Sequence, residues 1–132
     1  MKKNIDNFII VGKLNKKYLK AIKLNVKNNS LYISKNNLKH IEKKHKIELQ
    51  GLGITAQMFL ETVIINFNRI YQDKKTKAYF LVIYNEDKAD GVVLQVNLAL
   101  KNEFLEIKTA VPYRTAYFNN KILLFTKGAK PS

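Results

Sequence analysis

Residues 78–111 read AYFLVIYNEDKADGVVLQVNLALKNEFLEIKTAV, and this stretch decides the fold. It contains three β-rich segments, at 78–84, 92–100 and 104–111, separated by polar residues that are typical of turns. Short connections between consecutive strands favour antiparallel pairing. Pro112 follows the third segment and is expected to end it. The stretch therefore predicts the main part of an antiparallel β meander.

Short strands are predicted outside this stretch as well. Residues 69–72 and 122–126 have β-rich composition and flank the meander in sequence. Nearer the N-terminus, composition or period-two alternation predicts strands at 8–14, 21–27 and 31–33.

Two helices are predicted between these groups of strands. Ser34 is a good N-cap for a basic amphipathic helix at 35–46, and Thr55 is a good N-cap for a helix at 56–66. The residues expected to end the first helix are Gly51 and Gly53.

These elements predict an α+β fold, in which N-terminal short strands and two helices pack on a C-terminal antiparallel β meander of about four strands. The 132 residues fit a single domain, 1–132, with a frayed tail at 128–132. A hydrophobic fraction of 46% is enough for one core.

The charge is strongly positive along the whole chain. Lys and Arg total 24 against 10 Asp and Glu, a formal net charge of +14. The lysines run from Lys2 to Lys130, so the excess belongs to the folded body. A field of this sign attracts phosphate chains and anionic lipid. Codon bias is the alternative explanation, but it usually raises Glu along with Lys, and Glu stays low here.

Several classes of protein are excluded by what the sequence lacks. The chain has no cysteine, so a disulfide, a thiolate metal site or a cysteine nucleophile is impossible. No apolar run approaches the roughly 18 residues that a membrane span needs, and nothing resembles a signal peptide. The glycine-rich nucleotide-binding loops and the serine-hydrolase elbow are also absent.

The two histidines, His40 and His45, both fall in the predicted helix 35–46. A separation of five residues is a rotation of about 140° around a helix, so the rings do not share a face and a two-histidine metal site is not expected. His40 is the candidate general base or acid, and His45 is a second acid/base group or orients the helix. The alternative is that both are surface or half-buried helix residues.

A second group of candidate catalytic residues lies where the strand 104–111 is expected to break. RNA cleavage needs a base for the 2′-OH proton, an acid for the leaving 5′ oxygen, and cations or hydroxyls for the charge on phosphorus. The 2′-OH is a built-in nucleophile, so no metal is required. The alternative is an ordinary polar strand end. The members of this sheet cluster are Lys108, Thr109, Tyr113, Arg114 and Thr115.

Further lysines are candidate nucleic-acid contacts, because they lie on the outer face of the predicted helix or in a basic turn. They are Lys39, Lys43, Lys44, Lys74, Lys75 and Lys77.

The order of several segments resembles a known superfamily. The segments are VGKL at 11–14, LYIS at 31–34, LKHIEKKH at 38–45, FLETV at 59–63, NRI at 68–70 and KTAVP at 108–112. Over most of 8–127, the chain resembles the phage-associated nucleases grouped with barnase, EndoU, colicin-type tRNases and RelE, the BECR superfamily. The stretch with a strand, a serine and the helix motif His-Ile-x-x-Lys-His is its most specific part.

The resemblance implies one or two helices on a four-stranded antiparallel sheet and metal-independent RNA cleavage. It implies that His40 and His45 match the helix histidines of such sites and that Thr109 matches a strand-end hydroxyl. One departure is the usual Asn-Pro after the second helix, which is replaced here by residues 66–68, Asn-Phe-Asn.

The expected function is therefore that of a metal-independent endoribonuclease that needs no cofactor and acts on RNA, with tRNA as one candidate. The expected setting is the cytoplasm of a bacterium, as a toxin or a phage or mobile-element effector, or a target cell if the chain belongs to a larger toxin. A cognate immunity or antitoxin protein is the expected protein partner, and no membrane partner is expected. Two alternatives stay open: a nucleic-acid-binding module without catalysis, and a structural or interaction protein of a mobile element.

Overall fold

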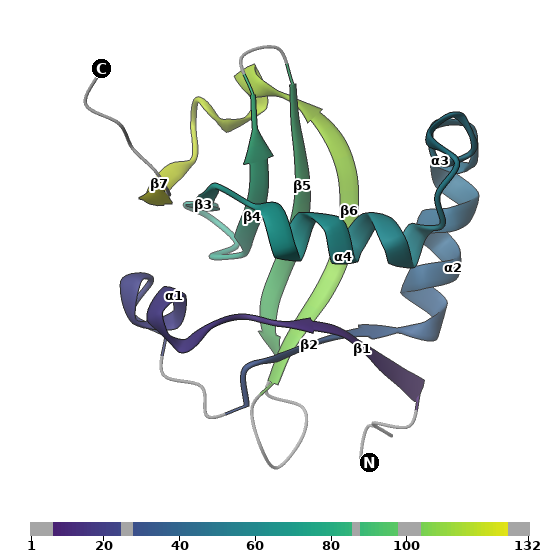
Figure 1. The fold of residues 1–132 in the computed structure, drawn as a ribbon. Coiled ribbons are helices and arrows are strands. Elements are labelled where there is room, and N and C mark those ends of the chain that lie inside the picture. Colours follow the sequence, from purple (N-terminus) through teal and green to yellow (C-terminus); the bar gives the residue numbers. More distant parts are fainter. Residues whose placement is uncertain (1–6, 25–27, 86–87, 98–103, 127–132) are drawn as a thin grey trace.

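The computed structural model of the chain describes residues 7–24, 28–85, 88–97 and 104–126. Within them, seven strands form one mixed sheet in the order β1-β2-β6-β5-β4-β3-β7 (Figure 1). The strands are β1 Phe8–Lys13, β2 Ser30–Ser34, β3 Arg69–Gln72, β4 Tyr79–Tyr84, β5 Lys88–Asn97, β6 Phe104–Arg114 and β7 Ile122–Thr126. The helices are α1 Lys16–Ala21, α2 Lys35–Lys44, α3 Lys46–Leu52, α4 Ala56–Asn66 and the short 3₁₀ helix η2 Thr115–Phe118.

The α+β class and the antiparallel meander are confirmed. β3, β4, β5 and β6 pair in chain order, each antiparallel to the next. β7 pairs antiparallel with the outer side of β3. On the opposite side of the meander, β2 pairs with β6 in parallel and so attaches the N-terminal strands.

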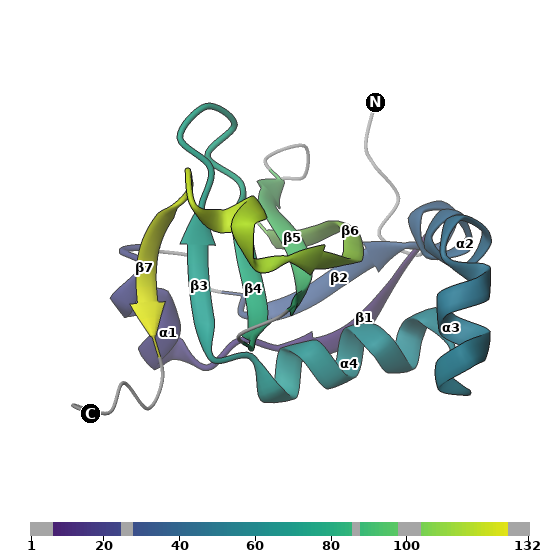
Figure 2. The same cartoon turned by 90° about the horizontal axis from the view of Figure 1, so that it is seen from above.

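The two faces of the sheet are covered differently. α4 lies across one face, where the large core forms (Figure 2). Apolar residues of the strands alternate towards this core, and Leu31, Ile70, Leu81, Leu105 and Ile107 are all essentially unexposed. The opposite face, called the η2 face below, carries a smaller cluster of Tyr71, Phe80, Val82 and Phe118.

The bounds of α4 agree with the predicted helix 56–66. The Thr55 hydroxyl accepts a hydrogen bond from the Met58 N–H at 3.1 Å, so it is the predicted N-cap. α4 lies close to β1, and a Cβ on Gly12 would come within 2.9 Å of Ile64 Cγ2. Glycine at position 12 therefore allows the close approach of helix and strand.

The predicted strand 21–27 is wrong where the structure describes it. α1 extends to Ala21, a turn follows, and residues 25–27 lie outside the described residues. The Asn15 side chain caps this helix by accepting from the Lys17 N–H at 3.0 Å. Tyr18, Leu19 and Ile22 are buried together, and their spacing of three and four is helical. The alternation of apolar and polar residues over 21–27 includes Ile22, and it led to the prediction of a strand in place of this helix.

The single helix predicted at 35–46 is two helices. α2 begins at its predicted N-cap, where the Ser34 hydroxyl accepts from the Asn37 N–H at 3.0 Å. His45 has φ −114° and ψ 27°, which interrupts the helix, and α3 then continues to Leu52. Gly53 ends α3 in the left-handed region at φ 68°, as glycine does at many helix ends.

Candidate functional site

A β-bulge at Lys108 marks the candidate site. Val93 of β5 pairs with Thr109, but the next residue, Leu94, pairs with Ile107, so Lys108 is an extra residue in β6. Ile107 and Ala110, three residues apart, therefore both belong to the large core. The strict alternation expected over 104–111 is broken at this point. Bulges of this kind redirect side chains and are frequent beside active sites.

Glu106, two residues before the bulge residue, is a buried carboxylate. Its side chain is 3% exposed, and its Oε2 atom lies 3.5 Å from the Nζ atom of Lys108, whose side chain is 42% exposed. A carboxylate is costly to bury unless it is paired or hydrogen-bonded. The pair therefore combines an interior negative charge with a cation that solvent can reach.

Glu106 and Lys108 line a hollow of about 350 Å³. The hollow lies where β2 and β6 diverge, because their parallel pairing covers only Leu31 with Leu105 and Tyr32 with Glu106. The other lining residues come from the beginning of β1 and the beginning of α2: Asn7, Phe8, Ser34, Asn36 and Asn37.

The beginning of α2 gives this hollow a second feature that favours anions. The first N–H groups of a helix have no intrahelical acceptor, and the helix dipole places partial positive charge there. Ser34 satisfies only the N–H of Asn37, and the first turn contains no acidic residue. Helix amides and the Lys108 ammonium thus converge on a space that also holds a carboxylate.

Thr109 lies on the η2 face of the sheet. It pairs with Val93, which pairs in turn with Phe80, and residues directly opposite in antiparallel strands share a face. Phe80 belongs to the η2-face cluster. Thr109 is therefore next to the bulge and on the face that also carries Glu106.

The rest of the predicted sheet cluster is further along β6. The backbones of Tyr113 and Arg114 pair with the beginning of β5, but their side chains lie outside the described residues. Thr115 is partly exposed in the first position of η2. The five residue-to-residue steps from Lys108 to Tyr113 span about 16 Å of strand. The cluster is therefore distributed along the strand, and only its first two members lie near the hollow.

Pro112 does not end β6, so this prediction is wrong. Pro112 lies inside the strand, opposite Asp90 of β5. Beyond Glu106, β6 has no described strand on its β2 side. Proline is tolerated at such a sheet edge, where its missing N–H is not needed.

His40 is exposed on α2 and is not among the residues that line the hollow. It follows the lining residue Asn36 by four positions, which places it on the same flank of the helix, about 6 Å further along the axis. α2 packs beside β6. α2 therefore lies beside β6 and begins at the hollow, whereas a meeting of the His40 ring with Lys108 and Thr109 stays a prediction.

His45 lies elsewhere. Its two ring nitrogens are buried and have no hydrogen-bond partner, and Nδ1 is 3.6 Å from Glu48 Oε2. It is roughly 14 Å from Asn36 along the helix axis. The structure does not bring His45 to the hollow, and its side chain is less exposed than that of His40.

The six candidate lysine contacts divide into two groups. Lys39, Lys43 and Lys44 are exposed on α2, whereas Lys74, Lys75 and Lys77 are exposed in the turn between β3 and β4. Figures 1 and 2 show this turn beside β3 and β4, well away from α2. β3 is three strand positions from β6, or about 14 Å. The two groups therefore do not contact the same phosphate.

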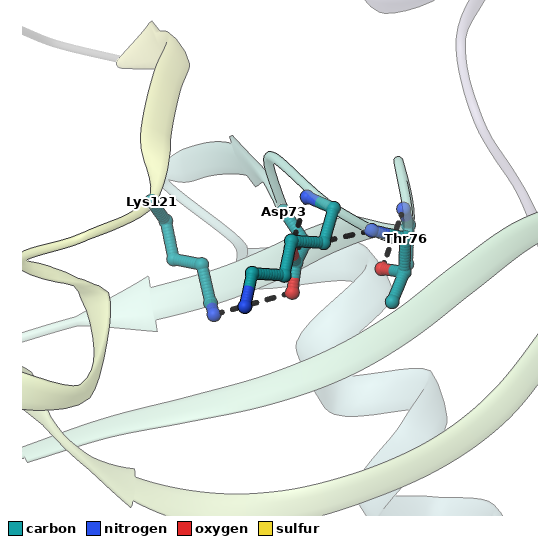
Figure 3. A network of polar contacts seen from close by, with 5 residues as sticks. Asp73, Thr76 and Lys121 are labelled. Atoms are coloured by element: carbon teal, nitrogen blue, oxygen red, sulfur yellow. Dashed lines mark hydrogen bonds and ion pairs between the residues drawn. The ribbon is translucent and has the colours of Figure 1, made fainter.

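A polar network fixes the β3–β4 turn (Figure 3). Asp73 Oδ1 accepts from the N–H groups of Lys75 at 2.8 Å and Thr76 at 3.4 Å, and Oδ2 lies 3.3 Å from Lys121 Nζ. The Lys75 N–H is the largest cause that lowers the pKa of Asp73; Thr76 and Lys121 act in the same direction, against burial. The network ties the turn to the segment between η2 and β7.

Glu106 is the site residue that the sequence did not single out. The available signal was a carboxylate between Leu105 and Ile107 in a β-rich segment. Alternation alone groups Glu106 with Lys108 on a polar side, which is compatible with an exposed ion pair. Its burial arises from residues of β1, β2 and α2 that are far away in the sequence.

Searches against protein-family models, curated proteins and solved structures found no match. The resemblance to the BECR nucleases therefore stays a prediction. In the part of the chain that the structure describes, no helix is long and apolar enough to cross a bilayer, and no three His, Asp or Glu side chains gather as candidate metal ligands.

Proposed function

We propose that the chain is a metal-independent endoribonuclease, which cleaves RNA through attack of a 2′-OH on the adjacent phosphate. The observation that carries this proposal is the Glu106–Lys108 pair in a hollow that also receives the beginning of α2. A proton acceptor and two kinds of anion-binding group lie within one small space. The net charge of +14 supports a polyanionic substrate.

In the proposed reaction, the Glu106 carboxylate takes the proton of the 2′-OH. The 2′ oxygen then forms a bond to phosphorus while the bond from phosphorus to the 5′ oxygen breaks. A protonated His40 gives its proton to the leaving 5′ oxygen. Lys108 and the first amides of α2 stabilise the charge that develops on the phosphoryl oxygens. The products are a 2′,3′-cyclic phosphate and a free 5′-hydroxyl.

The other predicted residues have supporting roles in this proposal. Thr109 donates a hydrogen bond to the phosphate from beside the bulge, and Lys39 and Lys43 bind the strand near His40. Tyr113 and Arg114, at the end of β6, and Thr115, at the beginning of η2, contact RNA further from the hollow. We assign His45 to the junction between α2 and α3, because its ring nitrogens are buried.

The experiment is product analysis with purified protein and an RNA pool in the presence of EDTA. Fragments that end in a 2′,3′-cyclic phosphate are expected. His40→Ala is expected to lower the rate by about 10²-fold or more, the scale of general acid–base catalysis. Glu42→Ala, at an exposed position of the same helix, is the matched control and should retain most of the rate. Absence of cleavage, or equal rates for His40→Ala and wild type, contradicts the proposal.

A second candidate is a nucleic-acid-binding module without catalysis. It is favoured by one observation, that His40 is not among the residues that line the hollow. In this case RNA binding falls steeply with salt, His40→Ala leaves it unchanged, and no cyclic phosphate forms.

The biological setting that we propose rests on the resemblance and the charge. The chain acts in the cytoplasm of a bacterium as a toxin or as a phage or mobile-element effector, with an immunity or antitoxin protein as its inhibitor. Co-expression offers a direct measurement, because wild-type chain should arrest growth and His40→Ala should not.

A further inference from the structure

Arg69, in the first position of β3, is held on the η2 face by two neutral aromatic side chains. Its Nη1 donates a hydrogen bond to the hydroxyl of Tyr71 at 2.8 Å. Its guanidinium carbon lies 3.7 Å from the centroid of the Tyr84 ring, in cation–π contact. The guanidinium is thereby fixed in orientation without being neutralised.

The backbone around this contact is also fixed. The N–H of Asn68 donates to the carbonyl of Val82 at 2.9 Å. The Asn68 side chain donates to the carbonyl of Tyr84 at 3.0 Å and accepts from the Tyr84 N–H at 2.7 Å. Asn68 therefore positions the beginning of β3 against the end of β4, and Arg69 loses little further freedom when it binds a ligand.

The charge of Arg69 has no internal counterion among the side chains that the structure describes. Lys108 and Lys121 each contact a carboxylate within 3.5 Å, whereas the contacts given for Arg69 are the two tyrosines. A guanidinium has five N–H donors in a planar fork, and one of them is used here. The remaining donors match the oxygens of a phosphate group.

We propose that Arg69 is a phosphate-binding subsite for a single-stranded polynucleotide, separate from the hollow but on the same face of the sheet. The identity of the strand as RNA rests on the proposed function. Through the register, Arg69 lies level with Val111 and three strand positions from β6. These offsets separate it from Lys108 by on the order of 17 Å. At roughly 3.4 Å per stacked nucleotide, a strand of about five nucleotides spans both sites.

The separation makes the proposal testable by substrate length. The probes are fluorescent 2′-O-methyl oligouridylates of 12 and of 2 nucleotides, which cannot be cleaved through a 2′-OH, and the measurement is the anisotropy of each with the full chain. Arg69→Gln is expected to weaken binding of the 12-mer by roughly 10-fold, the scale of a lost charge-assisted hydrogen bond, and to leave the dinucleotide unchanged. Lys108→Gln should weaken both.

Lys20→Gln is the matched control for charge. Lys20 is exposed on α1, which packs with the core on the other face of the sheet. It should change binding of the 12-mer by less than about 2-fold, the scale of a single screened surface charge. Arg69→Lys keeps the charge and removes the planar fork, so it should also weaken the 12-mer, and it carries the test if Arg69→Gln does not fold.

Three outcomes overturn the subsite. The first is that Arg69→Lys binds the 12-mer as tightly as wild type does, and the second is that Arg69→Gln loses equal affinity for the 12-mer and the dinucleotide. The third is that binding to phosphatidylserine vesicles depends on Arg69 while binding to RNA does not. Failure of the two proposals is distinguishable. Length-dependent binding through Arg69 without cleavage removes the ribonuclease and leaves the subsite, whereas cleavage with binding that is independent of Arg69 removes only the subsite.

Discussion

Lys108 and Arg69 are two cations on one face of the sheet, and the molecule holds them in opposite ways. Lys108 is partnered by the buried carboxylate of Glu106 and lies at the mouth of a hollow. Arg69 is held by the hydroxyl of Tyr71 and the ring of Tyr84, which carry no charge. The first arrangement contains a group that accepts protons, and the second does not.

This difference separates two tasks that a ribonuclease combines. Proton transfer needs an acceptor near the reacting oxygen, so the proposed reaction assigns it to the hollow. Holding a flexible strand needs fixed positive charge at a distance, so the proposed subsite assigns it to Arg69. Variants that affect one end and spare the other therefore test whether the tasks are divided in this way.

The largest effect is expected from Glu106→Gln. Glutamine keeps the shape of the side chain but does not take a proton, so cleavage should fall on the order of 10²-fold to 10⁴-fold. Binding of the 2′-O-methyl 12-mer should be retained, because the hollow loses a negative charge. Rates and affinities measured on the same preparation check this. Glu42→Gln, on the exposed side of α2, is the control. Parallel loss of cleavage and binding would show that Glu106 has only a structural role.

A smaller effect is expected in the salt dependence of binding. Each phosphate contact to a single strand contributes about 0.7 to the slope of log K against log salt. Lys108→Gln and Arg69→Gln should each lower the slope for the 12-mer by about this amount. Only Lys108→Gln should lower the slope for the dinucleotide. A titration series from low to high salt distinguishes the two ends of the face, and identical behaviour of both variants contradicts the division.

His45→Phe should have a moderate and stabilising effect. Both ring nitrogens are buried without hydrogen bonds, and an apolar ring of similar size removes that cost. The free energy of unfolding should rise by about 1 kcal/mol in urea denaturation. Cleavage should remain within about 2-fold, since the residue lies far from the hollow. A decrease in the cleavage rate close to the one expected for His40→Ala would indicate that His45 is a catalytic residue.

The smallest effect is expected from Asp73→Asn. The pKa of Asp73 is lowered from its usual value of 3.8, so the ionised carboxylate stabilises the fold above that pH, and the contribution is lost as the pH falls through the lower folded-state pKa. The melting temperature of the variant should be lower than that of wild type at neutral pH, and the difference between the two melting temperatures should become smaller in acid. Asp73 binds Lys121, whose Nζ atom lies 4.9 Å from the ring of Tyr117 in η2. Loss of the Asp73–Lys121 ion pair should therefore weaken binding of the 12-mer, which extends to Arg69, and should leave cleavage of a dinucleotide unchanged.

The elements that the sequence predicted correctly depend on local chemistry. Ser34 and Thr55 cap their helices through side-chain oxygens, and the bounds of α4 follow from its cap and its apolar stripe. The four meander strands follow from composition and turns. Short helices were missed where the spacing was ambiguous, as at Tyr18 and Leu19 of α1, whose burial is fixed by tertiary packing.

The site depends on features that no local pattern contains. The bulge at Lys108 exists only because β5 and β6 adopt a particular register. Glu106 is buried because β2 and the beginning of α2 close over one end of β6. The structure places α2 beside β6, and the sequence alone predicts candidate residues on both of these elements. The sequence did not indicate which residues they would place together.

The parallel pairing of β2 with β6 has a consequence for synthesis of the chain. Leu31 and Leu105 are far apart in the sequence, so the contact between them forms only after residue 105 has left the ribosome. A nascent chain of the proposed ribonuclease would lack the joined site and would leave the RNA of the translating ribosome intact. The same arrangement allows the gene to be divided at the β3–β4 turn, with neither fragment containing the complete hollow until the two halves reassemble.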